Sequence, residues 1–218
     1  MPETGRRGRG GVFPGARMSG DPDMVRRMEH PVGESWRRIA EGLERLAPVT
    51  AAAIRPAVAA AEVRRTVDAV GRPPPTDLLR WWGSMDGIAD EGHHPGTPIP
   101  PFYLPLPVAE VRDRLAGLVR FVDEQCCGPD GTHALAAGQP SFGFCAATVP
   151  ICRDVGGDLL VVDLRDGTRH GCVMEWSAEC GYSEPVWPGV ADMLADVADR
   201  LHDPTQTEIV EGGVLQWR

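Results

Sequence analysis

One segment, residues 150–176, constrains the fold of this chain more than any other part of the sequence. Its opening apolar stretch is followed by Gly156-Gly157, which is suited to a reversal of chain direction. Residues 159–164 are rich in branched apolar side chains that favour strands, and the pair Asp166-Gly167 after them is a common turn. Because a third apolar run comes directly after this turn, the sequence predicts a three-stranded antiparallel meander.

Helical periodicity lies on both sides of this meander. Apolar residues recur at spacings of three and four, which gives each helix one side for a core. The helices are expected at about residues 33–46, 56–70, 76–82, 108–124 and 187–202. A short strand at residues 102–104 is expected at a sheet edge, because Pro105 cannot donate a ladder hydrogen bond. Together these elements predict a single α+β domain with a mostly antiparallel sheet packed against several helices.

Gly, Pro and polar residues set the expected boundaries of these elements. Gly71 is expected to end the second helix, and Thr76 is expected to be the N-cap of the third. The pair Asp86-Gly87 is expected to turn the chain out of that third helix. Residues 177–185 are expected to form a loop.

The 218-residue chain is expected to form one domain with an extension at each end. Residues 1–30 are rich in Gly and Arg without periodicity, which predicts disorder. Residues 31–205 are assigned to the domain, and residues 206–218 to a C-terminal tail that has the pattern of a short hairpin. The first segment also contains alternative start positions, so that translation could begin at Met1, Met18, Met24 or Met28.

Acidic residues outnumber basic ones by 31 to 22, which gives a net charge of -9. The imbalance is largest after residue 150, where 13 acidic residues accompany 5 Arg. An acidic body argues against nucleic acid as a partner and favours a basic protein. No segment has the length and apolarity of a membrane span or of an export signal. We therefore expect a cytoplasmic protein with no membrane partner.

Cysteine and histidine side chains concentrate in two predicted loops. Zinc sites typically use pairs of ligands two to four residues apart, and vicinal Cys-Cys or His-His pairs do not supply that geometry. The sequence therefore predicts no metal site and no cofactor, and the cysteines are expected to be reduced thiols. Two of them, Cys152 and Cys172, are expected to be buried in strands. The residues considered as metal ligands are His93, His94, Cys126, Cys127, His133 and Cys145.

Carboxylates cluster in the meander, and a glycosidase-like acid pair must therefore be considered. Alternation places Asp163 on the same strand face as Leu159 and Val161, so its side chain is expected to be partly buried. The favoured role for Asp163 is to accept backbone N–H bonds from the following turn. The alternative is a small hydrolase that uses Asp163 together with Asp158 or Glu175.

The last predicted helix carries a narrow stripe of aspartates opposite its apolar side. Aspartate is a poor helix former, so helix propensity alone does not account for these choices. The stripe is interpreted as a solvated face or as a contact surface for a basic partner. Its members are Asp192, Asp196, Asp199 and Asp203.

Between residues 36 and 202, a series of short motifs resembles the SUKH superfamily, which includes fungal Smi–Knr cell-wall-assembly regulators and bacterial toxin-immunity proteins. The motifs are the helix end Ala69-Val70-Gly71, then Pro75-Thr76-Asp77-Leu78-Leu79 with Trp81-Trp82, then Asp86-Gly87, residues 100–106, the meander and the last helix. Within these motifs the matching positions are Gly71, Pro75, Trp82, Asp86, Gly87, Gly157, Asp158, Asp163, Gly167 and Gly171. The chain departs from the family pattern at Val67, at Pro74 and in a loop at residues 126–141 that looks inserted.

The resemblance implies an α+β fold without enzymatic activity and a surface that binds other proteins. Bacterial members are thought to neutralise toxins, many of them nucleases. The first hypothesis is therefore a non-catalytic SUKH-type binding protein that acts as an immunity protein. A scaffold or regulator without a toxin partner is the second hypothesis, and the hydrolase described above is the third.

Overall fold

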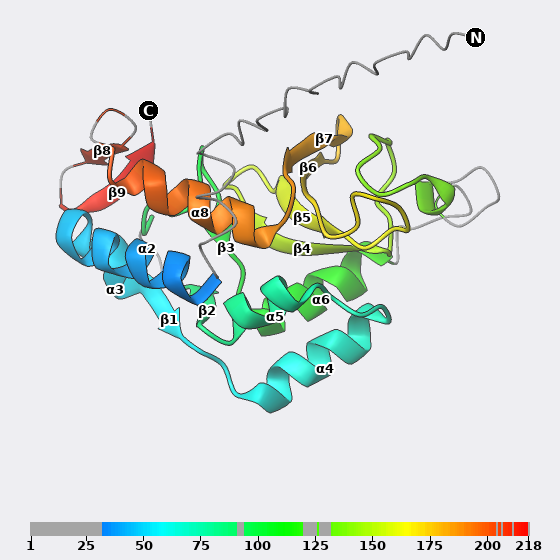
Figure 1. Ribbon diagram of the computed structural model, residues 1–218, viewed down its shortest axis with the longest axis horizontal. Coiled ribbons are helices and arrows are strands. Elements are labelled where there is room, and N and C mark those ends of the chain that lie inside the picture. Colours follow the sequence, from blue (N-terminus) through cyan, green and yellow to red (C-terminus); the bar gives the residue numbers. More distant parts are fainter. Residues whose placement is uncertain are drawn as a thin grey trace, which may run out of the picture.

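The protein has an α+β architecture in which antiparallel sheets pack against helices, and this confirms the predicted fold class (Figure 1). The computed structural model describes residues 32–90, 94–119, 126, 132–203, 205, 207–210 and 212–217. Residues 1–30, for which the sequence predicts disorder, lie outside this part.

A five-stranded antiparallel sheet forms the centre of the molecule, with strand order β3-β4-β5-β6-β7. Its strands are β3 (Leu104–Pro105), β4 (Thr148–Arg153), β5 (Leu159–Asp163), β6 (Val173–Ser177) and β7 (Gly181–Trp187). The expected meander is confirmed as β4, β5 and β6. β3 lies at the edge as expected, but it comprises Leu104 and Pro105 rather than residues 102–104. The expectation of a loop at residues 177–185 was wrong, because β7 begins there. Gly, Ser and Pro in this edge strand hide its pattern, and its register with β6 is irregular.

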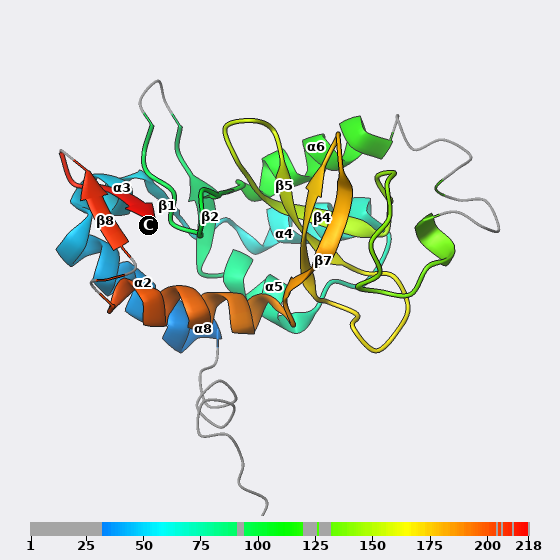
Figure 2. The ribbon, with the colours of Figure 1, turned by 90° about the horizontal axis from the view of Figure 1, so that it is seen from above.

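Helices pack against one side of this sheet and extend beyond its end (Figures 1 and 2). Helix α6 contacts β4 and α4, while α8 contacts β7, α5 and α2. Helix α2 runs beside α8, so the first and last described helices are neighbours. The helices are α2 (Val32–Leu46), α3 (Pro48–Ala53), α4 (Ala60–Val70), α5 (Thr76–Trp82), α6 (Val108–Val119), the short 3-10 helix η1 (Thr132–Ala134) and α8 (Val190–Leu201).

The helix expected at residues 56–70 is shorter than the sequence indicates. It begins at Ala60, and the preceding residues form α3 and the strand β1 (Ile54–Pro56). Pro48 fits the first turn of α3, where a missing N–H costs no helical hydrogen bond. Gly71 does end α4 in the left-handed conformation, with φ of 69°, as expected. Helix α5 begins at Thr76 itself, so this residue is not the N-cap that the sequence predicts.

The pair Asp86-Gly87 lies within the strand β2 (Met85–Ile88), which pairs with β1, and the expected turn there was wrong. Gly87 has φ of 69°, and a Cβ atom at this position would lie 2.3 Å from Pro107 N. Glycine is therefore required by close backbone approach as well as by conformation. The Asp86 carboxylate accepts a hydrogen bond from Val108 N–H (2.8 Å), where α6 begins, and it pairs with Arg55.

At the C-terminal end, β8 (Thr207–Val210) and β9 (Val214–Trp217) form an antiparallel pair. Leu215 N–H donates to the buried Thr50 Oγ1 (2.9 Å), and Trp217 Nε1–H donates to the Thr97 carbonyl (2.6 Å). The end of the chain is thus bonded to the body of the fold. Among the described helices, none combines the length and the apolar character needed to cross a membrane.

A fully buried ion pair lies at the end of β5. Both Asp163 and Arg165 are 0% exposed, and Arg165 Nη2 lies 2.8 Å from Asp163 Oδ2. The carboxylate also accepts N–H bonds from Gly138 (2.7 Å) and from the backbone of Arg165 (2.9 Å). Asp163 therefore does accept backbone bonds, but these come from Arg165 and the Gly138 loop, and the side chain is wholly rather than partly buried. Its partner Arg165 was not predicted from the sequence.

Replacing Asp163 by Asn should destabilise the protein strongly. The substitution leaves the Arg165 guanidinium buried without its counter-charge, which typically costs about 3–5 kcal/mol. Denaturant unfolding would measure this as a lower free energy of unfolding. The matched control is Asp166→Asn, because the Asp166 side chain is 99% exposed, and its effect should stay below about 0.5 kcal/mol.

The double substitution Asp163→Leu with Arg165→Met removes both buried charges at once. It should cost less stability than Asp163→Asn alone, since no unpaired charge is left in the interior. An equal loss for Asp163→Asn and Asp166→Asn would contradict this account of the ion pair.

Candidate functional site

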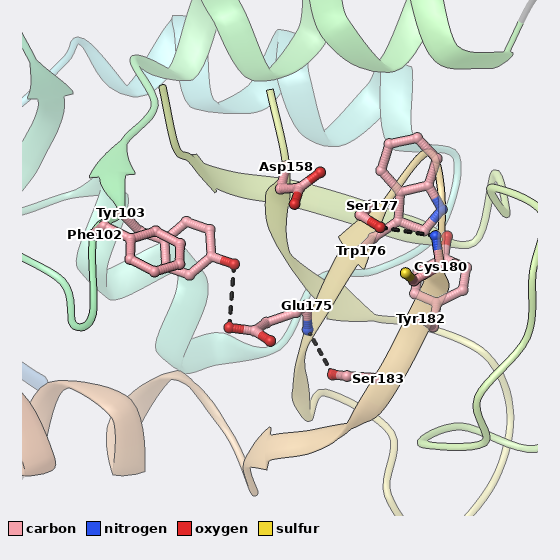
Figure 3. A pocket seen from close by; sticks show the side chains of 10 residues that line it. Phe102, Tyr103, Asp158, Glu175, Trp176, Ser177, Cys180, Tyr182 and Ser183 are labelled. Carbon is pink, nitrogen blue, oxygen red and sulfur yellow. Dashed lines mark hydrogen bonds between the residues drawn. The ribbon is translucent and has the colours of Figure 1, made fainter. Parts of the chain in front are cut away.

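A pocket of about 230 Å³ opens between the β3 edge of the sheet and the β6–β7 hairpin (Figure 3). Its walls combine aromatic rings with carboxylates and small polar side chains. The lining residues are Phe102, Tyr103, Asp158, Glu175, Trp176, Ser177, Cys180, Gly181, Tyr182 and Ser183.

Tyr103 and Glu175 meet across this pocket. The Tyr103 hydroxyl donates to Glu175 Oε1 (3.1 Å) and points toward it in Figure 3. Burial and the neighbouring Glu175 charge raise the pKa of Tyr103, so the hydroxyl stays protonated and remains a donor. The backbone N–H of Glu175 donates to Ser183 Oγ (3.0 Å). Glu175 is thus held in position from two sides.

Aromatic side chains give the pocket its apolar surface. Phe102 is 48% exposed and contacts the Tyr103 ring with centroids 5.2 Å apart. Trp176 is held from behind by Phe144 in an edge-to-face contact at 5.2 Å. Its Nε1 atom is buried and makes no hydrogen bond within the described part of the chain.

Asp158 brings a second carboxylate to the pocket from the β4–β5 turn. Its N–H donates to Asp154 Oδ1 (2.8 Å), and its carbonyl accepts from Asp154 N–H (2.9 Å). Burial raises the pKa of Asp158, and the negative charges of Asp154 and Glu179 raise it further. Since no basic side chain is among the lining residues, the pocket favours a cation.

The structure separates the carboxylates that the sequence groups as a candidate hydrolase site. Asp158 and Glu175 line the same pocket, whereas Asp163 is enclosed with Arg165 and does not face it. Asp166 is exposed and lies 3.7 Å from Arg72. Among the aromatic residues of the pocket, none was singled out from the sequence as a site residue, because β3 and β6 are distant in the chain.

The aspartate stripe is largely engaged in bonds within the chain, and its last member, Asp203, lies beyond the end of α8. Asp196 accepts from Trp187 Nε1–H (2.9 Å) and from Arg200 Nε–H (3.1 Å). Asp199 is 61% exposed and pairs with Arg38 (2.9 Å). Asp203 accepts hydrogen bonds from Thr205 N–H (2.9 Å) and from Thr205 Oγ1–H (2.7 Å). Asp192 and Asp196 line a pocket beside Trp187. Binding of a partner by this stripe stays a prediction.

Several positions of the family-like motifs have structural roles. Trp82 is buried in the core. Gly171 and Pro75 lie close together, because a Cβ atom on Gly171 would be 2.9 Å from Pro75 Cγ. Gly157 and Gly167 lie in turns with positive φ. These contacts connect the motifs of α5 to those of the meander.

Three of the six residues considered as metal ligands come together in space. The ligand atoms of Cys126, His133 and Cys145 all lie within 4.8 Å of one another. Cys127 and His93 lie outside the described residues, and His94 accepts a bond from Gly96 N–H elsewhere. The spacing of these three residues along the chain gave no signal for a metal site. Cys152 and Cys172 are both buried as expected, but only Cys152 lies in a strand, because β6 begins after Cys172. Each described cysteine is a free thiol.

Comparison with models of known protein families finds no match, and a search among curated proteins finds no relative. The resemblance to the SUKH superfamily therefore stays a prediction from the motifs. The observed site must be interpreted by its own chemistry, as an acidic, aromatic pocket that can accept a cationic group.

Replacing Asp158 by Asn should stabilise the protein at neutral pH. The raised pKa means that the fold disfavours the ionised form, so the charge costs stability above the folded pKa. This cost is absent below the unfolded value of about 3.9, and the advantage of Asp158→Asn should vanish there. Thermal unfolding at pH 7 and at pH 3 measures both effects.

The exposed Asp68, on α4, gives the control for this measurement. Asp68→Asn should leave the melting temperature nearly unchanged at both pH values. A lower melting temperature for Asp158→Asn at pH 7 would contradict the electrostatic account of the pocket.

Proposed function

We propose that this protein is a non-catalytic protein-binding domain of SUKH type that recognises a basic protein partner. The observation that carries the proposal is the pocket in which Asp158 and Glu175 lie among aromatic rings without a basic neighbour in the lining. Such a pocket fits a side chain that carries positive charge on a flat or compact head group.

Arginine is the side chain that this pocket suits best. Its guanidinium forms charge-assisted hydrogen bonds with carboxylates and stacks on aromatic faces. The pocket lining contains both carboxylates and aromatic rings. The Glu175 carboxylate is already held by the Tyr103 hydroxyl, so little ordering of this side chain is needed when a cation binds.

A toxin domain is the partner that the family resemblance favours, and the protein would then act as an immunity protein in the cytoplasm. Nuclease toxins need a cationic surface to hold their substrate, and the net charge of -9 complements such a surface. A scaffold or regulator without a toxin partner would use the same pocket for another basic protein.

The hydrolase stays the third hypothesis, and it is supported by the shared pocket of Asp158 and Glu175 and by the raised pKa of Asp158. Asp163 has no part in this candidate, since its carboxylate is buried against Arg165. A carboxylic acid with a raised pKa is suited to general acid catalysis. Hydrolysis of a panel of aryl glycosides that is lost in both Asp158→Asn and Glu175→Gln would favour this candidate over the binding protein.

Titration with N-acetyl-arginine amide should shift the NMR signals of Trp176 and Tyr103. The neutral analogue N-acetyl-citrulline amide has nearly the same shape and should bind much more weakly, because it lacks the charge. Glu175→Gln should weaken arginine binding about tenfold or more, as expected for a hydrogen bond between charged groups.

Glu44→Gln is the matched control, since Glu44 is exposed on α2 away from the pocket. It should bind the arginine probe like the unchanged protein. Equal binding of the arginine and citrulline probes would contradict cation recognition by this pocket.

Co-expression with toxins encoded by neighbouring genes tests the immunity hypothesis. The unchanged protein should restore growth, and Glu175→Gln should protect less well. The triple substitution of Asp192, Asp196 and Asp199 by Asn tests the stripe in the same assay. Growth inhibition that the protein never relieves would remove the immunity hypothesis, and an isolated gene would favour the scaffold.

A further inference from the structure

A second site lies apart from the pocket, where Cys126, His133 and Cys145 meet. Cys126 and Cys145 are buried, and His133 is half-buried between them and Arg72. Their Sγ atoms and a ring nitrogen of the histidine all lie within 4.8 Å of one another. Two thiols and an imidazole form a ligand set that zinc prefers over hard cations such as magnesium or calcium.

The distances in this cluster are close to those of a tetrahedral site. Zinc–sulfur bonds of about 2.3 Å and zinc–nitrogen bonds of about 2.0 Å place neighbouring ligand atoms roughly 3.5–3.8 Å apart. Cys145 Sγ and His133 Nδ1 are already 3.8 Å apart. Only small movements of side chains are therefore needed to surround an ion.

The backbone around Cys145 also suits a metal thiolate. Ala147 N–H donates to Cys145 Sγ (3.4 Å), and such a bond to sulfur stabilises its negative charge. The backbone N–H of Cys145 is itself fixed by the Tyr182 hydroxyl (2.8 Å). Burial raises the pKa of the Cys145 thiol to about 12, so a bound ion must displace the thiol proton.

The orientation of His133 determines which nitrogen can bind the ion. Arg72 Nη2 lies 2.6 Å from His133 Nε2, and a guanidinium can only donate. In the neutral ring the proton is therefore on Nδ1, directed toward Cys145 Sγ. An ion bound at Nδ1 moves this proton to Nε2, so that Arg72 must release the ring. Arg72 has other acceptors in the Leu164 carbonyl (2.9 Å) and the Asp166 carboxylate (3.7 Å).

We propose that Cys126, His133 and Cys145 form a zinc-binding site in which His133 coordinates through Nδ1. Water or an external ligand completes the tetrahedron. The bound ion ties Cys126 to the segment that leads into β4. It thereby connects the loop that looks inserted to the central sheet, independently of the acidic pocket and of any partner.

Titration of the reduced, chelator-treated protein with Co²⁺ tests the proposal, because cobalt reports its ligands spectroscopically. The expected result is a sulfur-to-cobalt charge-transfer band with intense visible bands of tetrahedral cobalt, all lost when Zn²⁺ displaces the probe. Zinc should also raise the melting temperature of the unchanged protein by preferential binding to the folded state.

Variants assign the ligands. Cys126→Ser and His133→Gln should abolish or strongly weaken the cobalt bands, whereas Cys180→Ser, at an exposed cysteine outside the cluster, should leave them unchanged. Circular dichroism of each variant without metal shows whether it is folded.

Arg72→Gln tests whether the guanidinium opposes the bound ion. The glutamine carbonyl can accept the new Nε2–H, whereas arginine opposes it, so zinc should bind about tenfold more tightly. Weaker binding in Arg72→Gln would overturn the assignment of Nδ1.

The proposal as a whole fails if the reduced protein gives no charge-transfer band. It fails equally if the band persists in Cys126→Ser or disappears in Cys180→Ser. None of these results depends on whether the acidic pocket binds arginine, so the two proposals are tested separately.

Discussion

The buried pair of Asp163 and Arg165 is the interaction on which both candidate sites depend. Removing two charges from water is costly, and the pair is tolerated because hydrogen bonds surround both partners. The carboxylate accepts bonds from Gly138 and from Arg165, while the guanidinium donates to the Gln139 carbonyl (2.8 Å). Burial alone would lower the pKa of Arg165, but the adjacent Asp163 raises it above its usual value. The pair thus fastens the loop before β4 to the end of β5.

Tyr182 connects the buried ion pair to both candidate sites. The Arg165 guanidinium lies 5.5 Å from the centre of its ring, and its hydroxyl bonds to Cys145 N–H and to Thr148 Oγ1 (2.8 Å each). One edge of Tyr182 therefore positions a cysteine of the proposed zinc site, while the residue also lines the acidic pocket. The two sites share one rigid support, although their chemistries are independent.

Local patterns in the sequence predicted the elements whose residues repeat regularly. The meander and most of the helices follow from alternation and helical spacing, and Gly71 was correctly identified as a helix end. Prediction was wrong where tertiary contacts override local signals. Asp86-Gly87 has the composition of a turn, but both residues lie in β2, which pairs with β1, and the close approach of the Pro107 backbone explains why glycine is needed there. The strand β7 was missed because Gly181 and Pro185 obscure its alternation.

The sites themselves depend on contacts between residues far apart in the chain, and local spacing cannot reveal these. The charge count shows that the C-terminal third is acidic. The aspartate stripe was therefore considered as a binding surface for a basic partner. Asp196 and Asp199 are, however, already paired with Arg200 and Arg38. A partner that binds there must first displace an intramolecular cation, which reduces the net gain from each new contact. Glu175 bonds to a neutral hydroxyl instead, so a cation that binds in the pocket adds charge pairing without replacing any. For this reason we place the proposed recognition in the pocket rather than on the stripe.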